Sequence, residues 1–257
     1  MGDRPLALVT GASGGIGEAF ARELARQGHD LVIVARSADR LEKLAAELGE
    51  VEVEVLPADL QASDQLATVE KRVSAVDRPV DILVNNAGYG TAGAFRDLPI
   101  DREIGSVDLN ISALVRLTHA ALQPMVERGS GGILNVASIG AFQPAPNNAT
   151  YSATKAFVLS FSEALHEEVK PLGVRVTCLA PGLTRTEFQQ TAGISGNVAP
   201  GFMWADANDV ARVGLKGLRR NKAVIVPGFM NKATAMLVHL MPRAVVRKAA
   251  KQVTKRF

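Results

Sequence analysis

Tyr151 and Lys155 are the two residues whose types and spacing most directly suggest chemistry in this sequence. In a helix, an offset of four residues places both side chains on one face, one turn apart. A phenol with a pKa of about 10 is a poor proton donor or acceptor near neutral pH, but a neighbouring ammonium group would lower that pKa. The pair therefore predicts a general acid/base, with a chance pair on a solvated helix as the alternative.

A glycine-rich turn near the start of the chain indicates a bound anion. Gly11, Gly15 and Gly17 follow the apolar run of residues 6–10 and precede a helical pattern. Glycines permit a tight turn and a close approach of the backbone to a pyrophosphate, and the free N–H groups of the next helix point at the anion. The turn lacks the Gly-Lys-Ser/Thr of a P-loop, which disfavours a nucleoside triphosphate and favours a dinucleotide.

The elements that must position these residues alternate between short apolar runs and amphipathic patterns. We expect strands at 6–10, 31–35, 51–56, 80–84, 133–137 and 174–179, and helices at 16–28, 38–48, 63–76, 102–127 and 151–171. This rhythm is typical of βαβ units and predicts an α/β fold, a Rossmann-like doubly wound parallel sheet. Such sheets bind ligands at the carboxyl ends of their strands. We expect one dinucleotide-binding and catalytic domain over 1–228, followed by a C-terminal helical extension at 229–257.

Composition excludes several classes of protein. The single cysteine, Cys178, rules out an intramolecular disulfide framework, and its apolar neighbours suggest a buried strand residue. No signal peptide is evident, which together with the cysteine content favours a cytoplasmic protein. No run is long and apolar enough for a transmembrane helix, and the scattered histidines suggest no metal site.

The stretch from Thr184 to Ala205 interrupts the alternation. It has no clear periodicity, and residues 188–205 carry no charge. A long uncharged segment after a strand predicts a mobile lid over a substrate, with a disordered surface loop as the alternative. An apolar pocket could be supplied by Phe142, Pro144, Ala145, Phe188, Met203 and Trp204.

Six motifs in order along the chain resemble the short-chain dehydrogenase/reductase family, over about residues 5–226. They are T-G-x-x-x-G-I-G at 10–17, N-N-A-G at 85–88, Asn110, Ser138, Y-x-x-x-K at 151–155 and P-G at 181–182. The segments 36–41, 137–138 and 150–155 are similar to the subset of NADPH-dependent carbonyl or 3-oxoacyl reductases.

The resemblance implies a role for each motif. Tyr151 would give a proton to the substrate carbonyl oxygen, and Ser138 would hydrogen-bond and polarise that oxygen. Lys155 would lower the Tyr151 pKa and hold the nicotinamide ribose, while Asn110 would position a water that relays protons. The implied cofactor contacts are Gly11, Ser13, Gly15, Ile16, Gly17, Arg36, Asp59, Leu60, Asn86, Ala87, Gly88, Tyr151, Lys155, Pro181, Gly182 and Thr184, with Thr186 as an alternative to Thr184.

The choice of cofactor depends on the end of the second strand. An acidic residue there would accept a hydrogen bond from the ribose 2′-hydroxyl, but this chain has Ala35 followed by Arg36. A guanidinium can bind a 2′-phosphate with two hydrogen bonds. We therefore predict NADP(H), with Arg36 as the main contact and Ser13, Ser37 and Arg40 as helpers; the alternative is a solvated Arg36.

The extension at 229–257 repeats apolar residues at helical spacing, interrupted by Pro242. Residues 210–257 hold twelve Lys and Arg and no Asp or Glu, whereas the remainder holds 17 basic and 26 acidic residues. Three interpretations stay open: helices on an anionic membrane, a surface for the phosphates of a CoA or carrier-protein thioester, or helices packed on the body or on a partner subunit.

Taken together, the sequence predicts an oxidoreductase that transfers hydride from NADPH to an apolar ketone or oxoacyl compound. One alternative is an NADP-dependent secondary alcohol or steroid dehydrogenase, and another is a nucleotide-binding sensor or scaffold with little turnover. The resemblance also implies a homodimer or homotetramer, paired through 102–127 and 151–171. No motif indicates binding to nucleic acid.

Overall fold

The fold is built on one parallel sheet, as the alternating pattern predicts. The computed structural model describes residues 4–192 and 200–253. Seven strands lie in the order β3-β2-β1-β4-β5-β6-β7, and every neighbouring pair is parallel. Their bounds are β1 (Leu6–Thr10), β2 (Asp30–Ala35), β3 (Val53–Pro57), β4 (Ile82–Asn85), β5 (Gly131–Val136), β6 (Val174–Leu179) and β7 (Val224–Ile225).

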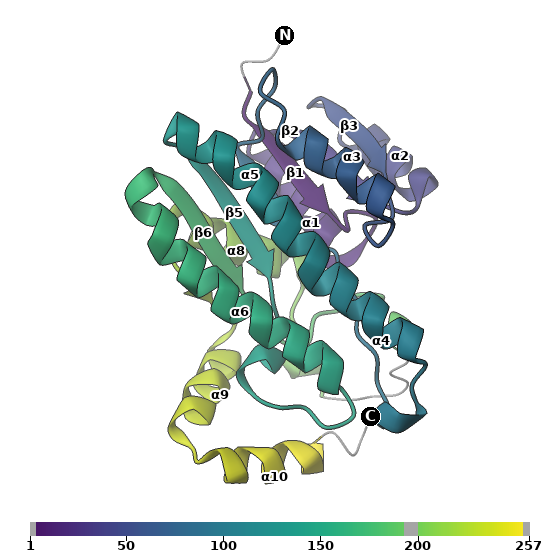
Figure 1. Cartoon of the computed structure of the whole chain (residues 1–257), viewed down its shortest axis with the longest axis vertical. Coiled ribbons are helices and arrows are strands. Elements are labelled where there is room, and N and C mark those ends of the chain that lie inside the picture. Colours follow the sequence, from purple (N-terminus) through teal and green to yellow (C-terminus); the bar gives the residue numbers. More distant parts are fainter. Residues whose placement is uncertain (1–3, 193–199, 254–257) are drawn as a thin grey trace.

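Helices cover both faces of this sheet (Figure 1). Phe20 of α1 and Leu215 of α8 belong to the core on one face, whereas Val69 of α3 and Leu117 of α5 belong to the core on the other. The predicted Rossmann-like doubly wound architecture is therefore confirmed. The helices are α1 (Gly15–Arg26), α2 (Ala38–Glu47), α3 (Ser63–Val73), α4 (Ile100–Val107), α5 (Leu114–Arg128), α6 (Ala149–Val169), α7 (Phe188–Thr191), α8 (Ala207–Arg219), α9 (Phe229–Leu240) and α10 (Arg243–Val253).

Several predicted bounds differ from the structure by a residue or two at an end, and three differences have an identifiable cause. The helix expected at 102–127 is α4 and α5 joined by a π-helical turn, Asp108–Ala113, and Pro124 lies inside α5. The strand expected from 51 begins at 53, because the N–H of Val51 still bonds Leu48 O at the end of α2. The two-residue strand β7 was not predicted, since so short a run carries no periodicity.

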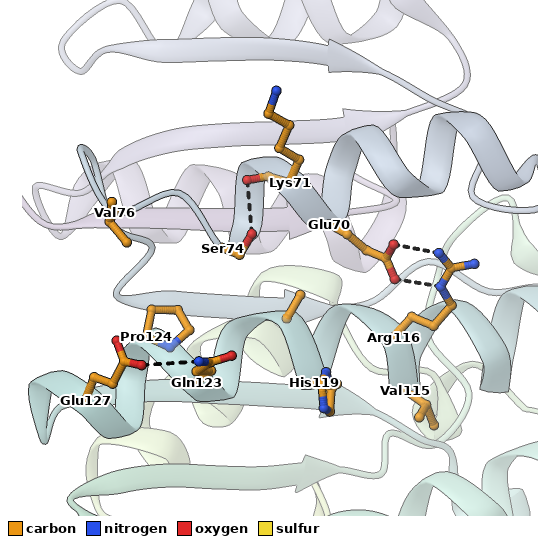
Figure 2. A pocket seen from close by; sticks show the side chains of 11 residues that line it. Glu70, Lys71, Ser74, Val76, Val115, Arg116, His119, Gln123, Pro124 and Glu127 are labelled. Atoms are coloured by element: carbon orange, nitrogen blue, oxygen red, sulfur yellow. Dashed lines mark hydrogen bonds and ion pairs between the residues drawn. The ribbon is translucent and has the colours of Figure 1, made fainter.

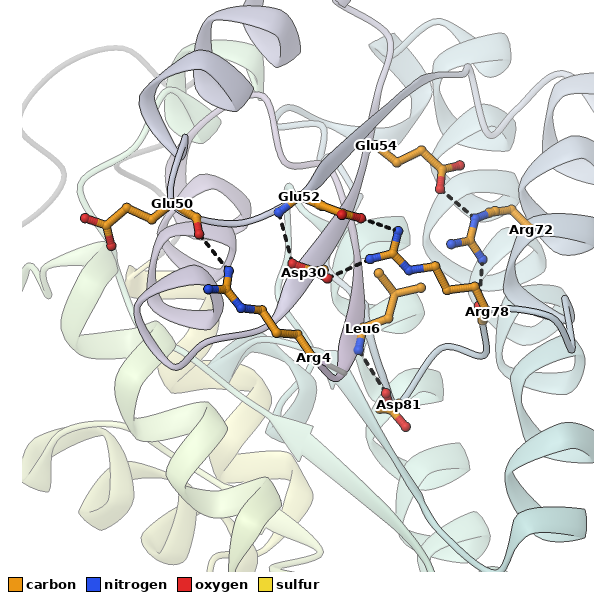
Figure 3. Close-up of polar contacts among 9 residues, drawn as sticks. All are labelled: Arg4, Leu6, Asp30, Glu50, Glu52, Glu54, Arg72, Arg78 and Asp81. Atoms are coloured by element: carbon orange, nitrogen blue, oxygen red, sulfur yellow. Dashed lines mark hydrogen bonds and ion pairs between the residues drawn. The ribbon is translucent and has the colours of Figure 1, made fainter. Parts of the chain in front are cut away.

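The amino ends of the first strands are held by ion pairs (Figure 3). Asp30, 3% exposed at the start of β2, pairs with Arg78 at 2.6 Å and accepts from the N–H of Glu52 at 2.9 Å. Arg78 also pairs with Glu52, and Asp81 accepts from the N–H of Leu6. This network fixes the edge of the sheet opposite to the carboxyl ends of the strands.

A surface groove of about 640 Å³ runs between α3 and α5 (Figure 2). The Arg116–Glu70 ion pair lies at one end of it, and Glu127 lies at the other. None of the predicted site residues lines this groove, so it belongs to the outer surface of the helices.

The segment predicted as a lid and the C-terminal extension also contain regular structure. The lid contains α7 and a 3₁₀ turn, Gly201–Met203, and the N–H of Ala205 returns to Leu183 O at 2.8 Å; residues 193–199 lie outside the described part. The extension forms α9 and α10, separated near Pro242. Within the described ranges, no helix has the length and hydrophobicity needed to cross a membrane.

Candidate active site

The sequence motifs meet at the carboxyl ends of the central strands. β1, β4, β5 and β6 run in the same direction, so the residues that follow each strand share one edge of the sheet. The strand order reverses at β1, which pairs with β2 on one side and β4 on the other. Parallel sheets bind ligands at such a switch point.

The glycine turn after β1 is held by the N-N-A-G segment after β4. Thr10 Oγ1 accepts from the N–H groups of Asn86 and Ala87 at 3.0 Å each, and Asn86 Nδ2 donates to Thr10 O at 3.0 Å. A Cβ at Gly17 would lie 2.1 Å from Gly11 O, and therefore no larger residue fits. Thr10 was not predicted as a site residue, although it begins the first motif.

The turn also fits a pyrophosphate. Gly14 precedes α1 without any capping side chain, so no side chain competes for the N–H groups of the first helical turn. A Cβ at Gly14 would have nothing closer than Arg40 at 4.0 Å, so backbone lies open there. Ser13 and Ile16 are half-buried in the same turn.

Ser138, Tyr151 and Lys155 come together at the end of β5. Ser138 Oγ hydrogen-bonds the Tyr151 phenol and accepts from the N–H of Gly140 at 3.1 Å. Lys155 is 5% exposed, and its Nζ donates to Val136 O at 2.8 Å. The structure thus places the expected proton donor, its hydrogen-bonding partner and the ammonium in one site.

The pKa of the phenol shifts in the opposite direction to the prediction. Burial raises the pKa of Tyr151 to about 12, and the hydrogen bond from Ser138 opposes this shift. Burial lowers the pKa of Lys155 to about 8. The lowering of the Tyr151 pKa expected from Lys155 is not seen: burial is the largest cause of the shift, and the Lys155 charge is not among its causes. A phenol with this pKa stays protonated at neutral pH and can act as a proton donor.

Asn110 lies in the π-helical turn between α4 and α5 and is 1% exposed. Its Nδ2 donates to Tyr89 O at 2.9 Å and to Thr154 Oγ1 at 3.0 Å, and its Oδ1 accepts from the N–H of Tyr89 at 3.1 Å. A Cβ at Gly88 would lie 2.7 Å from Asn110 Oδ1 and 3.4 Å from Lys155 Nζ. Asn110 and Lys155 are therefore neighbours across Gly88, as a relay between them requires. π-helical turns often occur at functional sites.

The residues expected near the adenosine lie along β2, α2 and β3. Arg36 is exposed just after β2 and makes no ion pair with the residues that the structure describes. Arg40, expected as a helper, pairs with Glu187 at 2.7 Å. Asp59 accepts from the N–H of Gln61 at 3.0 Å, and Leu60 is buried beside it.

The residues expected near the nicotinamide follow β6. Pro181 and Thr184 are buried, and Thr184 Oγ1 donates to Gly182 O at 3.1 Å. A Cβ at Gly15 would lie 2.9 Å from Thr186, so this segment packs directly against the glycine turn. A Cβ at Gly182 would lie 2.4 Å from Nδ2 of Asn231 in α9. Asn231 was not predicted, and nothing local in the sequence marks it.

The residues predicted to line a substrate pocket differ in how buried they are. The Phe188 ring of α7 lies 5.4 Å from the Tyr151 ring, centroid to centroid, at 49°. Phe142, Ala145 and Trp204 are partly buried, whereas Pro144 is exposed and Met203 is 46% exposed. The apolar cover over the phenol is thus provided by Phe188.

A buried chain of amides beside the site was not predicted either. Asn85 Nδ2 donates to Thr118 Oγ1 and to Asn135 Oδ1, each at 2.9 Å, and Asn135 Nδ2 donates to Ser162 Oγ at 3.0 Å. These bonds join α5, β4, β5 and α6. They hold the strand ends that carry the site at a fixed spacing.

Comparison with known proteins shows the family of the chain. The family model described as short chain dehydrogenase matches residues 5–195. The chain belongs to the short-chain dehydrogenase/reductase family. It is an oxidoreductase by this membership, and the resemblance seen in its motifs is confirmed.

Three similar proteins illustrate the range of the family. An uncharacterized oxidoreductase of Staphylococcus aureus is 34% identical over 186 residues, which are 72% of this chain and 80% of that protein. A short-chain dehydrogenase from Sphingobium yanoikuyae in complex with NADPH is 37% identical, with a TM-score of 0.83 over 93% of this chain and 97% of that chain. The bulky-bulky ketone specific alcohol dehydrogenase from Comamonas testosteroni is 36% identical, with a TM-score of 0.79 over 93% and 96%.

Proposed function

We propose that this protein reduces an apolar ketone or oxoacyl compound with NADPH, using Tyr151 as the proton donor. The observation that carries the proposal is the Tyr151 phenol, hydrogen-bonded to Ser138 and kept protonated by a pKa of about 12. In the reverse reaction, oxidation of a secondary alcohol, the same residue would act as the base.

Each group of residues has its own role in the proposed reaction. The turn at 11–17 and the start of α1 would hold the pyrophosphate, and Lys155 would hold the ribose hydroxyls. The bound nicotinamide supplies a hydride to the carbonyl carbon. Ser138 hydrogen-bonds the carbonyl oxygen as negative charge grows there, and Tyr151 donates its proton to that oxygen, which yields the alcohol. Phe188 shields the phenol from water.

Two observations support NADP(H) over NAD(H). Arg36 is exposed after β2 with no competing ion pair in the described ranges, and Ala35 offers no carboxylate to a ribose hydroxyl. The Sphingobium relative is a complex with NADPH.

An apolar ketone as substrate is supported by the Phe188 ring beside the phenol and by the ketone specificity in the name of the Comamonas relative. That name, an alcohol dehydrogenase, also favours secondary alcohol oxidation as the second candidate.

The test is an NADPH-oxidation screen over alkyl and aryl ketones, oxoacyl thioesters, steroids and aldehydes. We expect turnover of apolar carbonyl compounds, a fall of about 10²-fold or more in Tyr151→Phe, and unchanged NADPH affinity. Tyr89→Phe is the matched control, because that phenol donates to Arg102 O at 2.8 Å and not to the site. Turnover of hydrophilic polyols alone, or full activity in Tyr151→Phe, would refute the proposal.

A further inference from the structure

The helix α9 turns its apolar face outward. Its exposed residues include Phe229 at 83%, Met236 at 71% and Leu240 at 78%. Met230, Ala233 and Leu237 are also exposed, and at 100° per residue all six lie within about one third of the helix circumference. Asn231 and Ala235, on the opposite side, face the body of the protein.

This orientation is the reverse of an ordinary surface helix. A surface helix buries its apolar stripe and presents polar residues to water. Contiguous exposed apolar patches generally mark sites of interaction with proteins or membranes. The outward face of α9 therefore requires a partner that accepts apolar side chains.

The next helix adds positive charge. α10 buries Val246 and Ala250 and exposes Arg243, Arg247, Lys248 and Lys251. No acidic residue occurs in residues 210–257 to neutralise them. The two helices lie together at one end of the molecule (Figure 1).

We propose that α9 and α10 attach the protein to an anionic lipid surface. The apolar face of α9 would enter the interface between headgroups and acyl chains, and the basic face of α10 would lie among the lipid phosphates. A second copy docked through the same helices would bring the basic faces together, which electrostatic repulsion opposes. The phosphates of a thioester would satisfy α10 but leave the face of α9 exposed.

The test is co-sedimentation of the full chain with vesicles of phosphatidylcholine and phosphatidylglycerol, at low and high salt. We expect binding that salt weakens and that vesicles of phosphatidylcholine alone support poorly. Arg247→Gln and Lys251→Gln should each weaken binding about fivefold, and Leu240→Glu should weaken it about tenfold or more. Val76→Glu, at 80% exposure after α3, and Arg96→Gln, beside Asp97, are the matched controls and should bind like the wild type.

Circular dichroism should show all variants folded. No binding at low salt, or equal binding by Leu240→Glu and the wild type, would overturn the proposal. Light scattering on the same samples measures the oligomeric state, which separates lipid binding from contact between copies of the chain. An oligomer that Leu240→Glu dissociates, with no vesicle binding by the wild type, would assign this surface to contact between copies and overturn the proposal.

Discussion

The Nζ of Lys155 lies 5.8 Å from the centroid of the Tyr151 ring, while it donates to Val136 O at 2.8 Å. The ammonium is thus anchored to β5 and lies over the face of the Tyr151 ring. Burial keeps the proton on Tyr151 and moves the titration of Lys155 to about pH 8. The proton needed for the proposed reduction is therefore present on Tyr151 across the neutral range.

The buried ammonium predicts a pH-dependent stability. The folded-state pKa of Lys155 is about 8, below its ordinary value of 10.5, so the unfolded chain binds more protons between these values. Stability from this group should then rise with pH through that window, by about 3 kcal/mol at most, and stay flat below pH 8. The free energy of unfolding in urea is measured from pH 7 to 10 for the wild type and for Lys155→Met. The difference between the two isolates the effect of Lys155, because the contributions of the other titrating groups cancel. A difference that is constant over this range would contradict it.

Arg36→Ala should weaken NADPH binding without changing NADH binding. Removing an exposed guanidinium that contacts a phosphate costs about 1.5–3 kcal/mol, which is roughly tenfold to a hundredfold in Kd. Fluorescence titration with both cofactors measures it. Arg96→Ala, an exposed arginine outside the proposed site, is the control. Equal losses for NADPH and NADH would remove the case for a 2′-phosphate contact.

Glu187→Gln should strengthen NADPH binding. Glu187 pairs with Arg40 at 2.7 Å, and Arg40 would otherwise be available to a phosphate. The pair is exposed and therefore weak, so we expect an effect of about fivefold at most. Asp209→Asn, which breaks the similarly exposed pair with Arg212, should leave the Kd unchanged. Weaker NADPH binding in Glu187→Gln would show that Arg40 does not bind the phosphate.

Asp30→Asn should destabilise the fold and leave catalysis intact. It removes the charge of a carboxylate that is 3% exposed and bonded to Arg78 and to the N–H of Glu52, at the edge opposite to the site (Figure 3). A loss of about 2 kcal/mol is expected in urea unfolding, with kcat unchanged. Asp97→Asn, in an exposed pair, should cost about 0.5 kcal/mol or less. Equal costs for the two variants would contradict the structural role of Asp30.

Gly182→Ala should be destabilising through Asn231. The new Cβ would lie 2.4 Å from Asn231 Nδ2, and the resulting strain costs about 1–3 kcal/mol. The double variant Gly182→Ala/Asn231→Ala should recover part of this loss, a coupling that a double-mutant cycle measures. Gly49→Ala is the control, because its Cβ would meet nothing closer than 3.6 Å. Additive effects would show that the contact does not carry the strain.

The sequence predicted what is encoded locally. Strands β1 and β6 have the predicted bounds, because each is a short run of strand-forming residues that ends in a turn motif. The alternation of elements placed Ser138 just after β5 and put Tyr151 and Lys155 on the helix that follows, α6.

What could not be predicted depends on contacts between distant segments. The sign of the Tyr151 pKa shift depends on how deeply the packed fold buries its hydroxyl, which the Tyr-Lys spacing does not report. Glu187 was not expected as the partner of Arg40, because the two residues are far apart in the sequence. The π-helical turn at 108–113 was not expected either, because its residues continue the helical pattern of the segments on each side. The amide chain from Asn85 to Ser162 joins four elements, and no single window of sequence contains it.

The fit of Asn231 against Gly182 has a consequence for engineering the protein. Because the Asn231 side chain of α9 fills the space beside Gly182 in the turn after β6, the two segments pack closely against each other. A chimera that received its last helices from a homologue would need a compatible residue at each of the two positions. Exchanging those helices would therefore alter the packing of the turn after β6 as well as the outer surface of the molecule.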